Sequence, residues 1–309
     1  MSDLHFSVVI PAYNAAETLR STVASVLSQT DQRFEIIIID DGSTDDTPNV
    51  MLELAAVDYR IRAVSKPNSG VSATRNYGAS LASGEWLAFL DADDQWHPEK
   101  LARHSEVHSF NTLAGASFAQ VEFAPEQNGK IKAGRTFSSV PADYLGLKDV
   151  VVENAVCTTS NLVIRRDIFM ALSGFDTDMR YAEDQDFLAR AIDKGVLICG
   201  IHQALVRYRM SENGLSCNFD AMLENWRGFA SSWLFGRDLV EAEATYCRYL
   251  TRRVLRAGAP IDVAWSFMHR GLRADRKAYM ADGPRSFFTL GGVIAGGALP
   301  ASLRRTVFA

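Results

Sequence analysis

Cysteine is scarce in this chain of 309 residues, and no two of its four cysteines form a C-x-x-C pair. Neither a disulfide framework nor a zinc site built on paired cysteines is therefore expected. Reduced, buried thiols are the ordinary state for cysteines scattered in this way. The four are Cys157, Cys199, Cys217 and Cys247.

Positive charge is also in short supply, because 32 Lys and Arg residues stand against 37 Asp and Glu residues and the net charge is -5. A general nucleic-acid-binding protein needs a basic surface, so nucleic acid is not expected as a partner. No apolar run reaches the roughly 20 residues that span a bilayer. The first residues lack the basic and then apolar layout of a signal peptide, so a cytoplasmic location is expected.

What the chain does contain is an ordinary globular composition, with 47% hydrophobic and 22% charged residues. Apolar runs and helical patterns alternate over the first two thirds, which predicts an α/β fold with a mostly parallel sheet and helices on both faces. Strands are expected at 6–10, 34–39, 60–65, 85–90, 117–123 and 196–201, and helices at 15–29, 71–82, 97–111, 167–172 and 184–194. Residues 125–148 are expected to form a loop or hairpin, and helices are expected at 220–234, 238–257 and 262–280.

Acidic clusters follow two of the predicted strands. Asp40 and Asp41 end the second strand, and Asp91-Ala92-Asp93-Asp94 ends the fourth. Ligands of open α/β sheets lie outside the carboxyl ends of the strands. Three carboxylates so close repel one another, and their hard oxygen atoms suit Mg²⁺ or Mn²⁺ that also bridges phosphates. The alternative is an N-cap for the helix near Pro98, which needs only one of them.

Four segments together resemble the family 2 glycosyltransferases. They are Val8–Asn14, Asp40–Asp45, Asn68–Asn76 and Leu90–Asp94. The resemblance covers about residues 5–215 and implies the GT-A fold, a nucleotide-diphospho-sugar donor and inversion at the anomeric carbon. It implies a GT-A catalytic domain over 1–217, with a nucleotide-binding part at 1–115 and an acceptor part at 116–217. A mainly helical extension is expected at 218–309.

The resemblance also assigns residues to the donor and to the metal ion. Asp41 or its neighbour Asp40 receives the base or the ribose hydroxyls, although Asp41 also suits a plain turn residue. Arg75 approaches the nucleotide, with a surface ion pair as the alternative. Asp91 contacts the ribose or donor sugar, and Asp93, together with Asp91, binds Mn²⁺ or Mg²⁺. The donor-binding residues implied are Pro11, Ala12, Tyr13, Asn14, Asp40, Asp41, Arg75, Asp91 and Ala92.

A second acidic segment, Tyr181–Phe187, is similar to the family's "ED" motif before an apolar helix. Inverting transfer needs a base that takes the acceptor hydroxyl's proton as its oxygen attacks C1. Asp184 is the first choice for this general base and Glu183 the second. The alternative is a capping box at the start of the helix. A metal ion that neutralises the leaving diphosphate removes the need for a covalent intermediate.

The chain departs from the family pattern after Tyr208, because Met210 stands where a His is frequent. The identity of the metal's remaining ligands is therefore open. Arg207 or Arg209 is a candidate for binding the negatively charged diphosphate. The Gln-x-x-Arg-Trp motif of the processive synthases is absent, so a non-processive hexosyltransferase is expected. Its donor is a nucleotide-diphospho-sugar, with a UDP-sugar preferred, and its acceptor a hydroxyl of a saccharide, a lipid-linked glycan or a protein.

The apolar segment Ser286–Leu299 is too short to span a bilayer, and its glycines weaken it as a helix. Arg304 and Arg305 follow it, so the tail either meets a membrane surface or packs on the protein. The first alternative places the enzyme peripherally at the inner face of the membrane, in the synthesis of a cell-surface polysaccharide, lipid-linked glycan or glycoprotein.

Other classes of protein fit the sequence less well. A nucleotidyltransferase that makes the activated sugar would open with a glycine-rich, basic phosphate loop, which the segment after the first strand is not. A dinucleotide-dependent oxidoreductase would carry G-x-G-x-x-G after a strand, and none is present. A sugar- or nucleotide-binding module that has lost catalysis is the non-enzymatic alternative.

Overall fold

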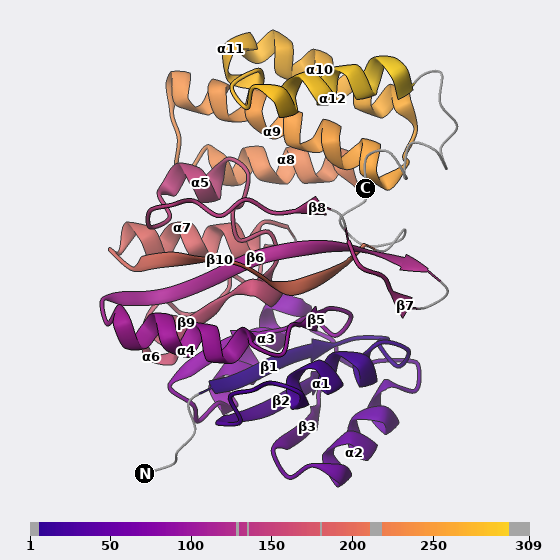
Figure 1. Cartoon of the computed structure of the whole chain (residues 1–309), viewed down its shortest axis with the longest axis vertical. Coiled ribbons are helices and arrows are strands. Elements are labelled where there is room, and N and C mark those ends of the chain that lie inside the picture. Colours follow the sequence, from indigo (N-terminus) through magenta and orange to yellow (C-terminus); the bar gives the residue numbers. More distant parts are fainter. Residues whose placement is uncertain (1–5, 128–129, 135, 180, 211–217, 297–309) are drawn as a thin grey trace. The chain divides into compact units, whose positions relative to one another are not determined.

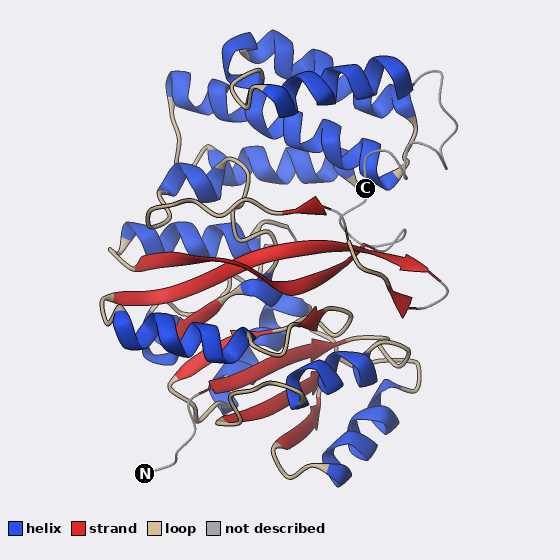
Figure 2. Ribbon diagram, viewed as in Figure 1, coloured by secondary structure: helices blue, strands red, loops and turns tan. Residues whose placement is uncertain are grey.

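The structure is a computed structural model that describes residues 6–127, 130–134, 136–179, 181–210 and 218–296 (Figure 1). Cys217, Arg304 and Arg305, which the sequence singled out, lie outside the described residues. The chain divides into two compact units. The sheet unit consists of residues 1–147 and 155–210, and the helical unit of residues 148–154 and 211–309. Figure 2 shows strands and helices in the first and, among the described residues, helices in the second.

Among the described residues, the sheet unit contains a sheet with the strand order β3-β2-β1-β4-β9-β6-β10-β5, and β7 and β8 also pair with β6. The strands are β1 (Phe6–Ala12), β2 (Phe34–Asp40), β3 (Ile61–Ser65), β4 (Trp86–Phe89), β5 (Gln95–Trp96), β6 (Ala114–Gln127), β7 (Lys130–Ile131), β8 (Thr136–Phe137), β9 (Val163–Arg165) and β10 (Leu197–Met210). The pairs among β3, β2, β1 and β4 are parallel, and so is β6 with β10. β9 and β5 pair antiparallel with their neighbours.

Helices cover both faces of the parallel strands. They are α1 (Leu19–Leu27), α2 (Thr47–Val57), α3 (Val71–Leu81), α4 (Lys100–Phe110), α6 (Arg166–Ala171) and α7 (Glu183–Asp193). Side chains alternate along a strand, so Val8 and Ile10 of β1 join the core that includes the apolar faces of α1 and α2. Val9 points the other way, toward α3. A Cβ added to Gly78 of α3 would lie 2.5 Å from Val9 Cγ1, so this helix packs directly on the strand.

The first strand is longer than the sequence predicted. The sequence predicts a strand over 6–10, but β1 continues to Ala12, which pairs with Asp40 of β2. A proline is tolerated there because β4 has already ended beside Val9, whose carbonyl accepts the N–H of Leu90. The nitrogen of Pro11 faces this finished side, where no ladder partner needs its missing N–H.

Two further differences lie in the second half of the sheet unit. Strand β10 has 14 residues and pairs along most of β6, whereas only 196–201 was expected. The part of β10 after Ile201 carries many half-exposed and polar side chains. The apolar run that indicates a buried strand therefore ends before the strand does. The expected loop or hairpin at 125–148 is a hairpin at its start, since β7 folds back on β6.

The helical unit contains α8 (Phe219–Ala230), α9 (Gly236–Ala257), α10 (Ile261–Ala274), α11 (Arg276–Tyr279) and α12 (Pro284–Gly296), with most of α5 (Leu147–Val151). One helix was expected over 262–280, but Asp275 interrupts it and caps α11 by accepting the N–H of Ala278. The glycines of α12 do not prevent a helix there. No helix that the structure describes combines the length and apolarity needed to cross a bilayer.

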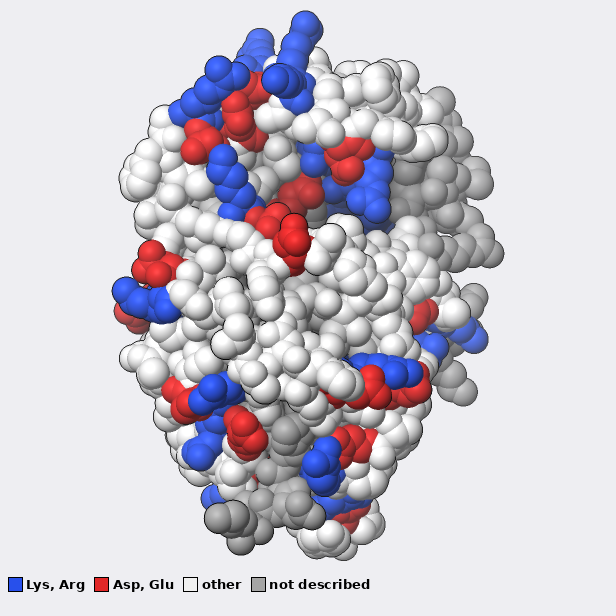
Figure 3. Space-filling view, turned by 60° about the vertical axis from the view of Figure 1, so that its left-hand side comes forward, with Lys and Arg blue, Asp and Glu red and all other residues white. Residues whose placement is uncertain are grey.

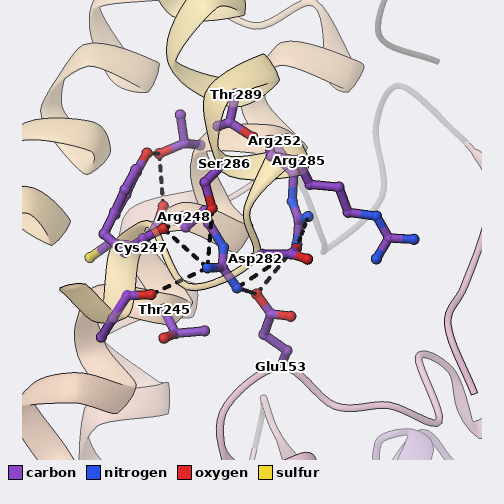
Figure 4. A network of polar contacts seen from close by, with 12 residues as sticks. Glu153, Thr245, Cys247, Arg248, Arg252, Asp282, Arg285, Ser286 and Thr289 are labelled. Atoms are coloured by element: carbon purple, nitrogen blue, oxygen red, sulfur yellow. Dashed lines mark hydrogen bonds and ion pairs between the residues drawn. The ribbon is translucent and has the colours of Figure 1, made fainter. Parts of the chain in front are cut away.

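A buried arginine joins the helices of this unit (Figure 4). Arg248 on α9 donates to the carbonyl of Tyr279 at 3.0 Å and to Glu153 Oε1 at 3.0 Å. Arg252, one turn later, pairs with Asp282 at 3.2 Å and with Glu153 at 3.3 Å. These five residues, which we call the Arg248 cluster, fix the turn between α11 and α12 against α9.

A second buried polar group lies between α4 and β6. Lys100 Nζ is 3.0 Å from His104 Nε2 and 3.3 Å from the carbonyl oxygen of Asn161, and His104 Nδ1 is 2.6 Å from Ser117 Oγ. Lys100 is fully buried, and burial lowers its pKa to about 7. Burial, together with the charge of Lys100, also lowers the pKa of His104 well below its usual value.

We predict that the free energy of unfolding rises with pH between about 7 and 10 because of Lys100. In the unfolded chain a lysine keeps its proton up to a pH of about 10.4, whereas folded Lys100 loses it near a pKa of about 7. The unfolded state therefore binds more protons in this window. The contribution of Lys100 is up to about 1.4 kcal/mol per pH unit, and urea denaturation at several pH values measures it.

Lys100→Met removes the titrating amine, so this part of the slope should disappear and the variant should be more stable at pH 7. The matched control is Lys194→Met, because the Lys194 side chain is 69% exposed. It should keep the wild-type slope. Equal slopes in the wild type and Lys100→Met would contradict the prediction.

Candidate active site

Both acidic clusters lie at the carboxyl edge of the parallel strands, on either side of β1. Asp40 ends β2, and the loop Asp91–Asp94, here called the acidic loop, follows β4. The strand order 3-2-1-4 reverses direction between β1 and β4, and α/β sheets bind ligands at such a reversal. The fold therefore brings both clusters to one expected binding position.

Asp41 is held by the start of α3. Its carboxylate accepts the backbone N–H groups of Ser69 and Gly70, both at 2.9 Å, and pairs with Lys66. Burial favours the neutral acid, but these donors outweigh burial and keep the pKa of Asp41 below its usual value. Asp40, rather than Asp41, stabilises the turn, because its Oδ1 accepts the N–H of Ser43 at 3.0 Å.

The segment after β1 is tied to the same turn. Asn14 has a positive φ of 48°, and its Oδ1 accepts the N–H of Thr44 at 2.8 Å. Tyr13 is 53% exposed beside it. Pro11 and Ala12 are buried in β1, and Ala12 belongs to the core. Of the predicted donor residues in this segment, Tyr13 and Asn14 are thus exposed, whereas Pro11 and Ala12 are buried.

The acidic loop is fixed from two sides. Thr18 and Thr22 of the first βα segment donate to the carbonyl of Ala92 at 2.8 and 2.9 Å. Ser160 Oγ accepts the N–H of Asp91 at 3.0 Å and donates to Asp94 Oδ2 at 2.6 Å. The loop therefore has a set shape before any ligand binds.

The three carboxylates of the acidic loop have different surroundings. Asp94 is 1% exposed, and burial, followed by the charges of Asp93 and Asp91, raises its pKa well above the usual value. Burial and the charge of Asp91 also raise the pKa of Asp93, to about 6. None of the three caps α4, because Glu99 occupies the N-cap position. The helix-cap alternative for this cluster was therefore wrong.

Asp93 fits a divalent cation better than its neighbours do. No described side chain donates a hydrogen bond to its carboxylate, whereas Asp91 pairs with Arg75 and Asp94 accepts from Ser160. A half-buried carboxylate that repels its neighbours is stabilised by a cation. In the described part of the chain, no three His, Cys, Asp or Glu side chains form a ready metal cage. Most ligands of a bound cation would then be phosphate oxygens and water, which suits Mg²⁺.

Arg75 joins the acidic loop to the second acidic motif. Its Nη2 donates to Asp91 Oδ1 at 2.6 Å and its Nη1 to Glu183 Oε1 at 2.9 Å. The side chain is 5% exposed and its guanidinium lies 5.6 Å from the ring centroid of Phe175. Burial disfavours the cation, but the charges of Asp91 and Glu183 outweigh it and raise the pKa of Arg75. The alternative of a surface ion pair is therefore wrong.

The second motif begins α7. The residue before it, Ala182, has a positive φ of 61°, which costs about 1 kcal/mol or more for a residue with a Cβ. No side chain caps this helix, so no capping box forms, although Asp184 Oδ1 accepts the N–H of Gln185 at 2.9 Å and three acids lie in the first turn. Glu183 is held by Arg75, and the half-buried Asp184 is the next residue, in the first turn. A strained residue thus sets the direction in which the motif enters the helix.

The two arginines of β10 are engaged by acidic residues and by the acidic loop. Arg209 is buried, its backbone N–H donates to Asp94 Oδ1 at 2.9 Å, and its Nε donates to the carbonyl of Asp93 at 2.9 Å. Arg207 pairs with Glu122 of the neighbouring strand at 3.0 Å. Arg209 therefore helps to hold the acidic loop in shape.

Sequence reasoning missed the residues that hold the loops in place. Lys66, Thr22 and the loop-holding roles of Arg209 and Ser160 were not recognised. Each of them acts through a partner distant in the sequence, such as Asp94 for Ser160, 66 residues away. A short motif carries no signal for such a pairing.

Comparison with known proteins gives consistent matches. The model of the family described as glycosyl transferase family 2 matches residues 7–173. The putative teichuronic acid biosynthesis glycosyltransferase TuaG of Bacillus subtilis is 28% identical, over 78% of this chain and 92% of TuaG. The amylovoran biosynthesis glycosyltransferase AmsB of Erwinia amylovora is 30% identical, over 68% of this chain and 71% of AmsB.

Solved structures share the fold at low identity. TarS 1-349 of S. aureus, in complex with UDP-GlcNAc, aligns with a TM-score of 0.55 and 19% identity, over 94% of this chain and 81% of that chain. The mannosyltransferase PcManGT of Pyrobaculum calidifontis, in complex with GDP-Man and Mn²⁺, aligns with a TM-score of 0.56 and 17% identity. The alignment covers 98% of this chain and 84% of PcManGT. These similarities extend to the fold alone.

Proposed function

Because this glycosyltransferase belongs to glycosyl transferase family 2 and has the GT-A fold, we propose that it moves one sugar at a time from a nucleotide-diphospho-sugar to a hydroxyl acceptor, with inversion. A UDP-sugar is the donor we favour. One observation carries the proposal. Buried Arg75 joins Asp91 of the acidic loop to Glu183 of the second motif, so residues that bind the donor and residues that activate the acceptor share one framework.

We assign the donor to the carboxyl edge around β1. The nucleotide lies between Tyr13 and the Asp41 turn, with Asp41 receiving the base and the backbone of Pro11 and Ala12 beside the ribose. Asp41 supports this role because Lys66 and two backbone N–H groups hold its carboxylate in one orientation. Asn14 and Asp40 shape the same turn. Asp91 and Ala92 face the ribose or donor sugar, and Arg75 acts on the donor through Asp91.

We assign proton acceptance to Asp184. Its neighbour Glu183 already accepts a hydrogen bond from Arg75, which suits a positioning residue. Asp184 lies in the first turn of α7, and from there its carboxylate takes the proton from the acceptor hydroxyl as that oxygen attacks C1 from the side opposite the diphosphate. One displacement with this geometry inverts the anomeric carbon.

Asp93, with Asp91 beside it, would hold Mn²⁺ or Mg²⁺. A cation there supplies positive charge that stabilises the leaving diphosphate. Arg209 and Ser160 keep the acidic loop in shape, since they bind the backbone of Asp93 and the carboxylate of Asp94. Met210 offers no metal ligand in place of a His, which agrees with a cation held mainly by phosphate oxygens and water.

The biological setting we propose is synthesis of a cell-surface polysaccharide, as the names of TuaG and AmsB suggest for those proteins. A lipid-linked glycan or protein acceptor would use the same chemistry. Residues 1–115 would bind the nucleotide, 116–217 the acceptor, and 218–309 would form an extension. The transfer step would take place at the inner face of the membrane.

The test is a panel of UDP-, GDP- and dTDP-sugars assayed for nucleotide release with Mn²⁺ or Mg²⁺, and with a chelator. We expect release from at least one donor with metal present and little with the chelator. A chain that binds a donor but never turns it over would be a binding module. If no donor were bound or consumed, the proposal would fail.

Asp93→Ala should weaken the apparent affinity for the metal at least about tenfold, because one of the few protein ligands is lost. The readout is the Mn²⁺ concentration that gives half-maximal nucleotide release. Asp193→Ala is the matched control, since Asp193 ends α7 and its side chain is 53% exposed beside Lys194, and it should keep the wild-type metal dependence. An unchanged metal dependence in Asp93→Ala would remove Asp93 from the metal site.

A further inference from the structure

Helix α12 presents its large apolar side chains mainly to solvent and mostly small or polar side chains to the helices beneath it. Phe287, Phe288 and Ile294 have 68, 76 and 66% of their surface exposed. A helix that covers a core has the opposite arrangement. The buried positions are Ser286, Thr289, Gly292, Val293 and Gly296. The exposed positions are Pro284, Arg285, Phe287, Phe288, Gly291, Ile294 and Ala295.

The exposed apolar positions form one stripe. They recur at spacings of three and four residues, so they lie along one side of the helix. We call this stripe the outer face of α12. The opposite side is anchored, because α12 packs on α9 and α10 and Ser286 Oγ donates to the carbonyl of Tyr279 at 3.0 Å. The helix cannot turn its phenylalanines inward without losing this contact.

Among the described residues, three exposed cations on α12 and on the helix before it form no ion pair. Arg285 lies on α12 itself, and Figure 4 shows its guanidinium directed away from the Arg248 cluster. Arg276 and Lys277 are exposed on α11, which precedes α12. The acids of this region are engaged, since Asp275 caps α11 and Asp282 pairs with Arg252. Figure 3 shows Lys and Arg side chains projecting from the helical unit, with Asp and Glu side chains among them.

We propose that the outer face of α12 docks on an anionic lipid surface. Two phenylalanines in one turn can enter the boundary between headgroups and acyl chains, while the flanking cations meet lipid phosphate. Helix α12 contains no acidic residue, so it presents apolar and positive groups alone. A second copy of the chain would offer the same cations and no acid on α12 to match them.

The outer face of α12 differs from the exposed aromatic residue at the end of α4, which stands alone. Phe110, at the end of α4, is 91% exposed but lies at a helix end rather than within such a stripe. Single exposed apolar residues are normal on soluble proteins and need no partner. Phe110 therefore provides a control with the same residue type and greater exposure.

The test is flotation of the full chain with vesicles, which needs neither donor nor turnover and so stands apart from the transfer reaction. Vesicles of phosphatidylcholine alone are compared with vesicles that also contain phosphatidylglycerol. We expect the wild type to float with the anionic vesicles and much less with the neutral ones, and high salt to weaken binding. The double variant Phe287→Ser/Phe288→Ser should lose about tenfold or more of its binding.

Arg285→Glu should lower binding to anionic vesicles about tenfold, since it reverses one charge near the surface. Phe110→Ser should bind like the wild type. Thermal melting identifies any variant that has not folded, and Arg285→Glu then serves as the second test. The proposal is overturned if the wild type does not float, if it floats equally with neutral vesicles, or if the double variant still binds. A wild-type dimer that the double variant dissociates, with no vesicle binding, would assign the face to a second copy.

Discussion

Asp184→Asn is expected to lower kcat about a thousandfold while leaving the affinity for the donor almost unchanged, because a general base typically contributes a factor of about 10² to 10⁴. Asparagine has nearly the same shape as aspartate but cannot accept the proton of the acceptor hydroxyl. The loss should therefore appear in turnover. Steady-state kinetics with the donor found in the nucleotide-sugar panel measure kcat, and calorimetric titration with the nucleotide measures binding.

Glu183→Gln is the matched control, one residue earlier on the same helix. It keeps a hydrogen-bond acceptor for Arg75 but removes the charge, so it should weaken donor binding and reduce kcat much less than Asp184→Asn does. The opposite result, a large fall in kcat for Glu183→Gln and none for Asp184→Asn, would exchange the two roles. Comparable turnover in both variants and the wild type would exclude the motif from proton transfer.

Those parts of the fold could be predicted whose burial produces a recognisable pattern of apolar residues in the sequence. The run Phe34–Ile39 is apolar apart from Glu35 because the strand is covered on both faces, and it is found as a strand, one residue longer. Strand β10 was predicted only in part, since its second half alternates buried residues with exposed ones such as Arg207. The two-residue strand β5 is set by pairing with Val206 and leaves no pattern of its own.

The candidate site likewise contains residues that the sequence predicted and residues that it did not. Its acidic residues could be found because several carboxylates follow strands in short, unusual runs. The partners that hold them could not be found, since Arg75 meets Glu183 across 108 residues and Arg209 meets Asp94 across 115. Such pairings come from the order of strands in the sheet. The strand order, with β9 and β6 placed between β4 and β10, is not contained in any local pattern.

Arg75→Met is expected to destabilise the protein by about 3 to 5 kcal/mol, because removing one partner of a buried ion pair leaves the other charge without compensation. Arg75 is 5% exposed and serves two acids, Asp91 and Glu183, whose side chains are 27 and 15% exposed. Methionine fills a similar volume, so the loss reflects charge and hydrogen bonds rather than a cavity. Urea denaturation measures the stability, and titration with UDP measures the accompanying loss of nucleotide affinity.

Arg165→Met is the control for this prediction, since its pair with Asp167 has side chains that are 43 and 62% exposed. An exposed pair of this kind contributes at most about 1 kcal/mol. If the cost of Arg75→Met is electrostatic, adding Asp91→Asn and Glu183→Gln to it should restore much of the stability, because neither carboxylate then remains unpaired. The restored protein should still lack activity. A triple variant as unstable as Arg75→Met would instead place the cost in packing against Phe175, and Arg75 would then no longer be the link between the donor and acceptor sides of the site.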